Sequence, residues 1–171
     1  MLVNATAEGG IGDAVSPARR VRDVRVPLLI AAGVVLLDQL TKHWALNALD
    51  DDHVVDVLWT LRFNLAFNKG MAFSSADWLG PVIPFLAIGV AVVLLVTIKR
   101  SGGSRWFVTA VGLVVGGSVG NVVDRLFRND GWLGGAVVDF IDLQWWPIFN
   151  VADIGIVVGG AILLWLTLQA P

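Results

Sequence analysis

Two aspartates in apolar surroundings are the residues of this sequence best suited to chemistry. Asp139 lies in the apolar, β-branched segment AVVDFID, and Asp153 lies in an apolar stretch with no basic residue within one helical turn. Two carboxylates brought together in a partly dry site cannot both ionise easily, so they share one proton. One carboxyl group then acts as a general base toward water and the other as a general acid. This is the chemistry of aspartyl proteases, and it needs no cysteine, metal or serine triad.

Other polar residues recur at spacings of three and four, which places them on one face of a helix. The sets are Asp38, Thr41 and Lys42; Asn121, Asp124 and Arg125; and Asn150 and Asp153. Each set also has a purely structural interpretation. Asp38 and Lys42 would neutralise each other as an ion pair. Asp124 and Arg125 would form a pair at the membrane interface, and Asn150 would cap a helix.

The composition is that of an integral membrane protein. Of the 171 residues, 56% are hydrophobic and 15% are charged, whereas soluble domains carry about 25% charged residues. The sequence has no cysteine and two histidines, which excludes disulfides and cysteine nucleophiles and argues against a structural zinc site. A net charge of −2 offers no basic surface for nucleic acid. We therefore expect no metal, no cofactor and no nucleic-acid partner.

Four apolar segments are long enough to cross a bilayer as helices, which takes about 20 residues each. They cover residues 26–46, 79–98, 106–127 and 148–168. Seven of the twelve basic residues flank these segments on one side, namely Arg19, Arg20, Arg22, Arg25, Lys99, Arg100 and Arg105. The positive-inside rule then predicts that both termini are cytoplasmic. The polar residues described above would gather near the outer membrane surface.

The other segments complete the predicted organisation. Residues 1–25 are expected to form a mobile cytoplasmic tail, and residues 26–168 a four-span membrane domain. Residues 60–65 alternate between apolar and polar, and GGAVVDFIDL is short and β-branched, so both predict extended segments outside the membrane. Glycines at four-residue intervals are typical of close helix packing; they are Gly112, Gly116 and Gly120. The predicted fold is an all-α membrane protein with four transmembrane helices and a small extracytoplasmic β-platform.

From the residues alone, three classes of function stay open. The first is proteolysis by the aspartate pair. The second is a small proton-coupled transporter with Asp38, Asp124 and Asp153 as a relay. Ionisable residues at mid-span or near the cytoplasmic end would favour a relay, but the second, third and fourth spans contain none there. The third is a structural partner protein, for which substitution of the aspartates would leave no biochemical phenotype.

Several blocks of the sequence, in order, resemble the lipoprotein signal peptidases, which are aspartyl proteases of the bacterial inner (cytoplasmic) membrane. The blocks are DQLTK (38–42), NKGMAFS (68–74), GGSVGNVVDR (116–125), VVDF (137–140) and FNVAD (149–153). With the four-span plan, the resemblance covers residues 26–168. Met71 is bulkier than the small residue usual at its position.

The resemblance implies removal of signal peptides from prolipoproteins, by cleavage just before a cysteine that carries diacylglycerol. It implies that Asp139 and Asp153 are the catalytic pair, near the outer face of the membrane. It also implies a set of residues that support the site or bind substrate, namely Asp38, Lys42, Asn68, Gly70, Gly120, Asn121, Asp124, Arg125, Asn150 and Ala152. The implied partners are prolipoprotein substrates and membrane lipids, and we expect a monomer.

Overall fold

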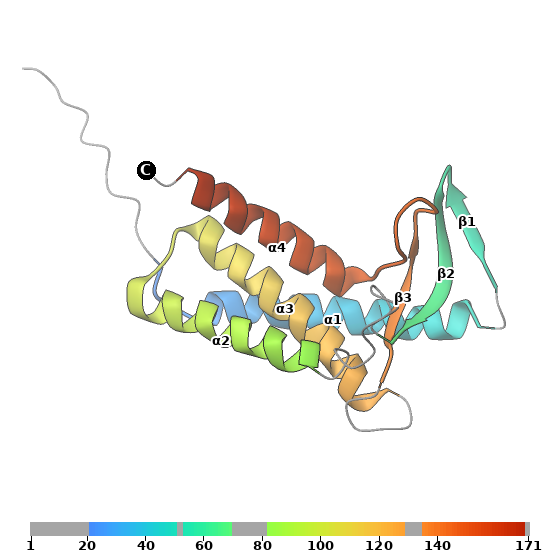
Figure 1. Ribbon diagram of the computed structural model, residues 1–171, viewed down its shortest axis with the longest axis horizontal. Coiled ribbons are helices and arrows are strands. Elements are labelled where there is room, and N and C mark those ends of the chain that lie inside the picture. Colours follow the sequence, from blue (N-terminus) through green and yellow to red (C-terminus); the bar gives the residue numbers. More distant parts are fainter. Residues whose placement is uncertain (1–20, 51–52, 70–81, 129–134, 170–171) are drawn as a thin grey trace, which may run out of the picture.

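Four helices running side by side make up most of the structure, a computed structural model that describes residues 21–50, 53–69, 82–128 and 135–169 (Figure 1). The helices are α1 (Arg25–Ala48), α2 (Val82–Ser101), α3 (Arg105–Phe127) and α4 (Val151–Leu168). Helices α1, α3 and α4 are each long and apolar enough to cross a membrane. Helix α2 has 20 residues, and its assignment as a fourth span stays a prediction.

The predicted spans agree with the helices to within about one turn. One difference of three residues concerns the last span, which was predicted from residue 148 and begins at Val151. Asn150 caps that helix, and Phe149 before it is paired with Ile141 through backbone hydrogen bonds. These two contacts keep residues 148–150 out of the helix.

Three short strands stand at one end of the helices, where α1 and α3 end and α4 begins (Figure 1). We call this the sheet end. The strands β1 (Val55–Leu58), β2 (Leu61–Asn68) and β3 (Val137–Asp142) form an antiparallel sheet in the order β1-β2-β3. The extended segments predicted from the sequence are confirmed as β2 and β3, whereas β1 was not predicted.

The sheet packs on the last turns of α1 through a small apolar cluster. Ala45 of α1, Leu49 directly after α1 and Phe140 of β3 are buried together. Trp44 of α1 packs edge-on against Phe63 and Phe140, with ring centroids 5.1 and 6.0 Å apart. Apolar burial and aromatic contacts therefore hold β3, and with it Asp139, in a fixed position over the helix ends.

Close helix packing through glycine is confirmed for α3. A Cβ at Gly116 would lie 2.8 Å from the carbonyl oxygen of Ala31 in α1, and a Cβ at Gly112 would lie 2.8 Å from Ile30. Gly117, on another side of α3, has no room for a side chain against the carbonyl of Ala152 in α4. Helix α3 therefore touches α1 and α4 almost backbone to backbone.

At the opposite end of the bundle, the chain just before α1 meets the α2–α3 turn. Val21 and Gly103 exchange two backbone hydrogen bonds of 2.8 and 2.9 Å. The basic residues near these helix ends therefore share one end of the bundle, remote from the sheet; those described are Arg22, Arg25, Lys99, Arg100 and Arg105. Residues 1–20 of the expected tail lie outside the described residues.

Candidate active site

A fully buried lysine joins α1 to α3 at the sheet end. The Nζ atom of Lys42 lies 2.9 Å from Asp38 Oδ2 and 2.8 Å from Asp124 Oδ2. It also donates a hydrogen bond of 3.0 Å to Asn121 Oδ1. Each of its three N–H bonds thus has an oxygen acceptor. The predicted Asp38–Lys42 pair is present, but as part of a larger cluster that also fixes Asn121.

Asp38 also contacts the beginning of α4. Its Oδ1 accepts a hydrogen bond of 3.0 Å from the backbone N–H of Ala152. The first turn of a helix has unpaired N–H groups and a favourable dipole for a negative charge. A Cβ at Gly120 would lie 2.7 Å from Asp38 Oδ2 and 3.2 Å from the Ala152 side chain. Small residues at 120 and 152 therefore allow α1, α3 and α4 to meet at this carboxylate.

Asp124 binds four groups from three elements. Besides Lys42, it accepts hydrogen bonds from Arg128 Nε at 2.7 Å and Gln39 Nε2 at 3.1 Å. It also accepts a bond of 3.2 Å from the backbone N–H of Val138, next to Asp139 on β3. Asp124 therefore connects α1 and α3 with β3, the strand that carries Asp139.

The expected pair between Asp124 and Arg125 is wrong. The ion pairs of Asp124 are with Lys42 and Arg128, because consecutive residues of a helix point in different directions and residues four apart are neighbours. The buried guanidinium of Arg125 interacts electrostatically most strongly with Asp139, less with Asp153 and least with Asp124. Arg125 thus supplies positive charge to the two aspartates.

Asp139 and Asp153 come from different elements and share amide partners. Asp139 on β3 is buried, and its Oδ1 accepts a bond of 2.6 Å from Asn150 Nδ2. The side chain of Asn68 on β2 also hydrogen-bonds Asp139. Asp153, in the first turn of α4, is half-buried. Its Oδ1 accepts from Asn121 Nδ2 at 2.8 Å, and its Oδ2 accepts from the backbone N–H of Asn150 at 3.2 Å.

Asn150 links the two aspartates while capping α4, as predicted. Its Oδ1 accepts the backbone N–H of Asp153 at 3.0 Å, which completes a capping box. Its Nδ2 donates to Asp139 and, at 3.1 Å, to Asn121 Oδ1. Since Asn121 is itself held by Lys42, a continuous set of hydrogen bonds runs from the lysine to both aspartates.

The environment of Asp139 favours its protonated form. Burial raises the pKa of the Asp139 carboxyl from its ordinary 3.8 to about 6, and the negative charge of Asp153 acts in the same direction. Hydrogen bonds from Asn68 and Asn150 and the charge of Lys42 oppose this shift without cancelling it. A carboxyl group with this pKa beside a second carboxylate is able to hold and release a proton near neutral pH.

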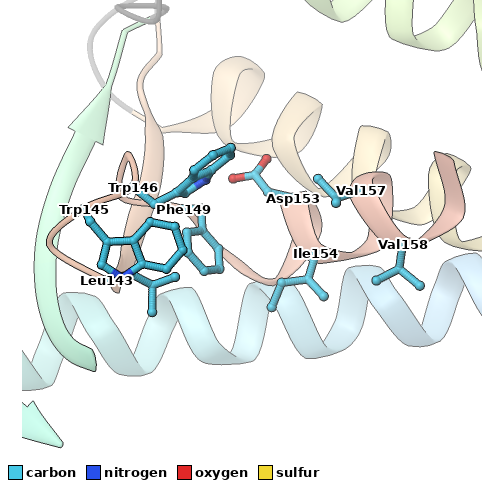
Figure 2. Close-up of a pocket in the computed structure, with 8 residues that line it drawn as sticks. All are labelled: Leu143, Trp145, Trp146, Phe149, Asp153, Ile154, Val157 and Val158. Carbon is cyan, nitrogen blue, oxygen red and sulfur yellow. The ribbon is translucent and has the colours of Figure 1, made fainter. Parts of the chain in front are cut away.

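An apolar cavity of about 370 Å³ opens beside Asp153 (Figure 2). In Figure 2, aromatic side chains of the β3–α4 connection stand on one side of the carboxylate and aliphatic side chains of α4 on the other. The lining consists of Asp153 with Leu143, Trp145, Trp146, Phe149, Ile154, Val157 and Val158. An apolar segment of a ligand can therefore lie directly against a carboxylate.

The structure brings together the predicted site residues that it describes. Gly70 lies outside the described residues. Gln39 and Arg128 were not predicted as partners of Asp124. The four-residue spacing of Asp124 and Arg128 was a usable signal, whereas nothing in the sequence marks the contact of Gln39 between two helices. Within the described ranges, no group of three or more metal-ligating side chains is present.

The chain is similar to a known family of proteins. The family model described as signal peptidase (SPase) II matches residues 30–169. The chain belongs to the signal peptidase II family. Proteins named lipoprotein signal peptidase resemble it at 45% identity over 154 residues in Mycolicibacterium smegmatis and 43% over 146 residues in Rhodococcus jostii. A third, from Mycobacterium tuberculosis strain H37Rv, is 42% identical over 164 residues.

These matches cover 90%, 84% and 95% of the chain, respectively. The chain spans 65% of the length of the M. smegmatis signal peptidase II relative, 73% of the R. jostii protein and 80% of the M. tuberculosis protein. Two solved structures described as bacterial membrane enzymes share the fold. Their TM-scores are 0.76 and 0.74 at 24% and 23% identity, over 90% and 91% of this chain and 93% and 100% of theirs. The chain is thus a multi-pass membrane protein of this family.

Proposed function

We propose that the chain is an aspartic endopeptidase of the bacterial cytoplasmic membrane. It removes the signal peptide from prolipoproteins that carry a diacylglyceryl cysteine, and it cuts just before that cysteine. Membership of the signal peptidase II family supports the class of reaction. The observation that carries the mechanism is the link between Asp139 and Asp153 through Asn150, together with the raised pKa of Asp139.

The balance of charge at the sheet end supports a singly protonated aspartate pair. The cations that bind or face the buried aspartates are Lys42, Arg125 and Arg128, and these aspartates are Asp38, Asp124, Asp139 and Asp153. The Arg62–Asp142 pair of the sheet is neutral by itself. Positive and negative charges are equal in number if the Asp139–Asp153 pair keeps one proton. Loss of that proton would leave an uncompensated charge in a largely buried site, which is costly. Below about pH 6, where the Asp139 carboxyl is protonated, the pair therefore holds one proton.

We assign that proton to Asp139, because it is the more buried carboxyl group. Asp153, at the pocket, takes a proton from water while the water oxygen bonds to the carbonyl carbon of the substrate. Asp139 gives its proton to the carbonyl oxygen, which forms a neutral tetrahedral diol. Asp153 then protonates the leaving nitrogen, the C–N bond breaks, and Asp139 recovers a proton from the diol. The positive charge of Arg125 stabilises the single negative charge of the pair, which moves from Asp153 to Asp139 as the diol forms.

The place of cleavage follows from the orientation of the bundle. The basic helix ends lie at the end opposite to the aspartates, so the positive-inside rule puts the aspartates near the outer membrane surface and both termini in the cytoplasm. A substrate held in the outer leaflet by its acyl chains presents its scissile bond at that level. The apolar cavity beside Asp153 accommodates apolar residues of the signal peptide.

The contacts at the sheet end do not favour a proton relay. Asp38 and Asp124 both bind the ammonium group of Lys42, so neither is a free carrier. A relay would also require its groups to be distributed across the membrane, whereas these lie together at one end with Asp153.

The test is cleavage of a purified prolipoprotein by the purified full chain in lipid nanodiscs. A substrate that carries the diacylglyceryl group should yield a new N-terminal lipidated cysteine, identified by mass spectrometry. The same polypeptide without the lipid is the control and should be cleaved at a much lower rate. Equal cleavage of both, or cleavage at another bond, would refute the proposed substrate class.

A further inference from the structure

The connection from β3 to α4 supplies one wall of the cavity beside Asp153. We call residues 143–148 the aromatic loop. Backbone hydrogen bonds between Ile141 and Phe149, of 2.8 and 3.1 Å, close its base. Trp145 and Trp146 in the loop line the cavity, with ring centroids 6.2 Å apart (Figure 2). The position of this loop therefore decides the width of the space that an apolar ligand enters.

The carboxylate of Asp142, the last residue of β3, is bound on both oxygens. Oδ2 accepts bonds of 2.7 Å from Arg62 Nε and 3.3 Å from Asn64 Nδ2, both on β2. Oδ1 accepts a bond of 2.6 Å from the backbone N–H of Gln144 in the aromatic loop. Burial alone would raise the pKa of Asp142, but these hydrogen bonds and the charge of Arg62 lower it below its ordinary value. Asp142 thus stays ionised and joins the loop to β2.

Gln144 makes the hydrogen bonds that hold the aromatic loop in place. Its φ angle of 67° lies in the left-handed region, which residues other than glycine rarely adopt. Its backbone N–H is held by Asp142, and its side chain donates a bond of 3.1 Å to the carbonyl oxygen of Thr60 in the β1–β2 turn. In the described part of the chain, the indole groups of Trp145 and Trp146 have no hydrogen bond of their own. The aromatic wall is therefore fixed through Gln144.

We propose that Asp142 and Arg62 are positioning residues for the substrate of the Asp139–Asp153 pair. They hold the aromatic loop opposite α4 and so shape the cavity that receives the apolar residues next to the scissile bond. Neither residue bonds Asp139 or Asp153; Asp142 is bound by Arg62, Asn64 and Gln144 instead. They therefore affect substrate binding rather than proton transfer. This inference rests on the proposed function.

Asp142→Ala removes the anchor of both Arg62 and Gln144. The KM for the diacylated prolipoprotein should rise about tenfold, equivalent to about 1.4 kcal/mol of binding free energy, while kcat and its pH profile stay unchanged. Asp142→Asn keeps an oxygen acceptor for the Gln144 N–H and should recover part of the loss in KM. Asp56→Ala is the matched control, because Asp56 is an exposed acid on β1 directly opposite Arg62, and its KM should equal that of the wild type.

Hydrogen–deuterium exchange gives a readout that needs no catalysis. The Gln144 amide should exchange faster in Asp142→Ala than in the wild type or in Asp56→Ala, with the helices unchanged. Unchanged exchange would refute the anchor, and faster exchange with an unchanged KM would refute its role in substrate binding. Loss of kcat at constant KM would also overturn the inference. A wild type that does not cleave the lipidated substrate would instead refute the proposed function, and that result is separate from the exchange measurement.

Discussion

Replacement of Lys42 tests the buried charge cluster. Its ammonium group has no solvent exposure and lies 2.8 and 2.9 Å from two carboxylates that are equally buried. Lys42→Met keeps a long apolar stem, so little cavity forms and the main effect is loss of the positive charge. Removal of one member of a buried ion pair costs about 3–5 kcal/mol, because the partner charge is left uncompensated. We expect Lys42→Met to lower the free energy of unfolding by an amount near the upper part of that range, because two carboxylates lose their partner.

The assay is unfolding of the purified protein in mixed detergent micelles at increasing SDS fraction. Lys69→Met is the control, because Lys69 is exposed, and surface substitutions stay within about 0.5 kcal/mol. Activity should fall with Lys42→Met as well, because Asn121 loses the donor that orients it toward Asp153.

A double-mutant cycle separates charge from packing. In the Lys42→Met background, Asp38→Asn removes one of the uncompensated charges. Asp38→Asn should therefore lower the free energy of unfolding by less in this background than in the wild type. The coupling expected for groups in direct contact is about 0.5–3 kcal/mol. Additive effects, or a loss with Lys42→Met no larger than with Lys69→Met, would refute the reasoning.

Three further outcomes follow from the site. The folded-state pKa of Asp139, about 6, lies above its ordinary 3.8, so the folded state binds this proton more tightly than the unfolded state. The free energy of unfolding should therefore fall by roughly 3 kcal/mol as pH rises from about 4 to about 6. Asp139→Asn should remove this dependence in thermal unfolding and be more stable than the wild type at pH 7; an unchanged slope would contradict the assignment. Arg128→Ala should cost only about 1 kcal/mol in the SDS assay, because Arg128 is 23% exposed, and a loss equal to that of Lys42→Met would be inconsistent with this. The cleavage rate should follow a bell in pH, since the pair must hold one proton, and EDTA should leave it unchanged; metal-dependent recovery after EDTA would exclude the mechanism.

The four helices, β2, β3 and most of the described site residues could be predicted from the sequence, because their signals are strong and local. Long, predominantly apolar stretches predicted the helices, and alternation predicted β2. Glycine spacing predicted a face of α3 that packs closely on another helix, and the structure shows that this helix is α1. Asn150 at the start of the last span was predicted as a helix cap, and the structure adds the reciprocal bond from Asp153. Each of these patterns reports contacts within one element or along one face.

Contacts between elements could not be predicted from the sequence. Asp124 was paired with its neighbour Arg125, yet the fold brings it Lys42 from α1 and turns Arg125 toward the aspartates. β1 has exposed side chains throughout, so it lacks the alternation that reveals a half-buried strand. The aromatic wall of the cavity depends on Gln144 crossing to Thr60. Such partners lie far apart in sequence, and no periodicity encodes them.

In the proposed mechanism, Asp139 and Asp153 together perform the cleavage. The most direct measurement is the single-turnover rate of Asp139→Asn and Asp153→Asn on the diacylated prolipoprotein, beside Asp56→Asn as an exposed aspartate control. Asparagine keeps the size and hydrogen bonding of aspartate but cannot transfer the proton. We expect near-complete loss of cleavage in both variants, with helical content retained, and a wild-type rate in Asp56→Asn. Substantial cleavage by either of the two site variants would contradict the proposed mechanism.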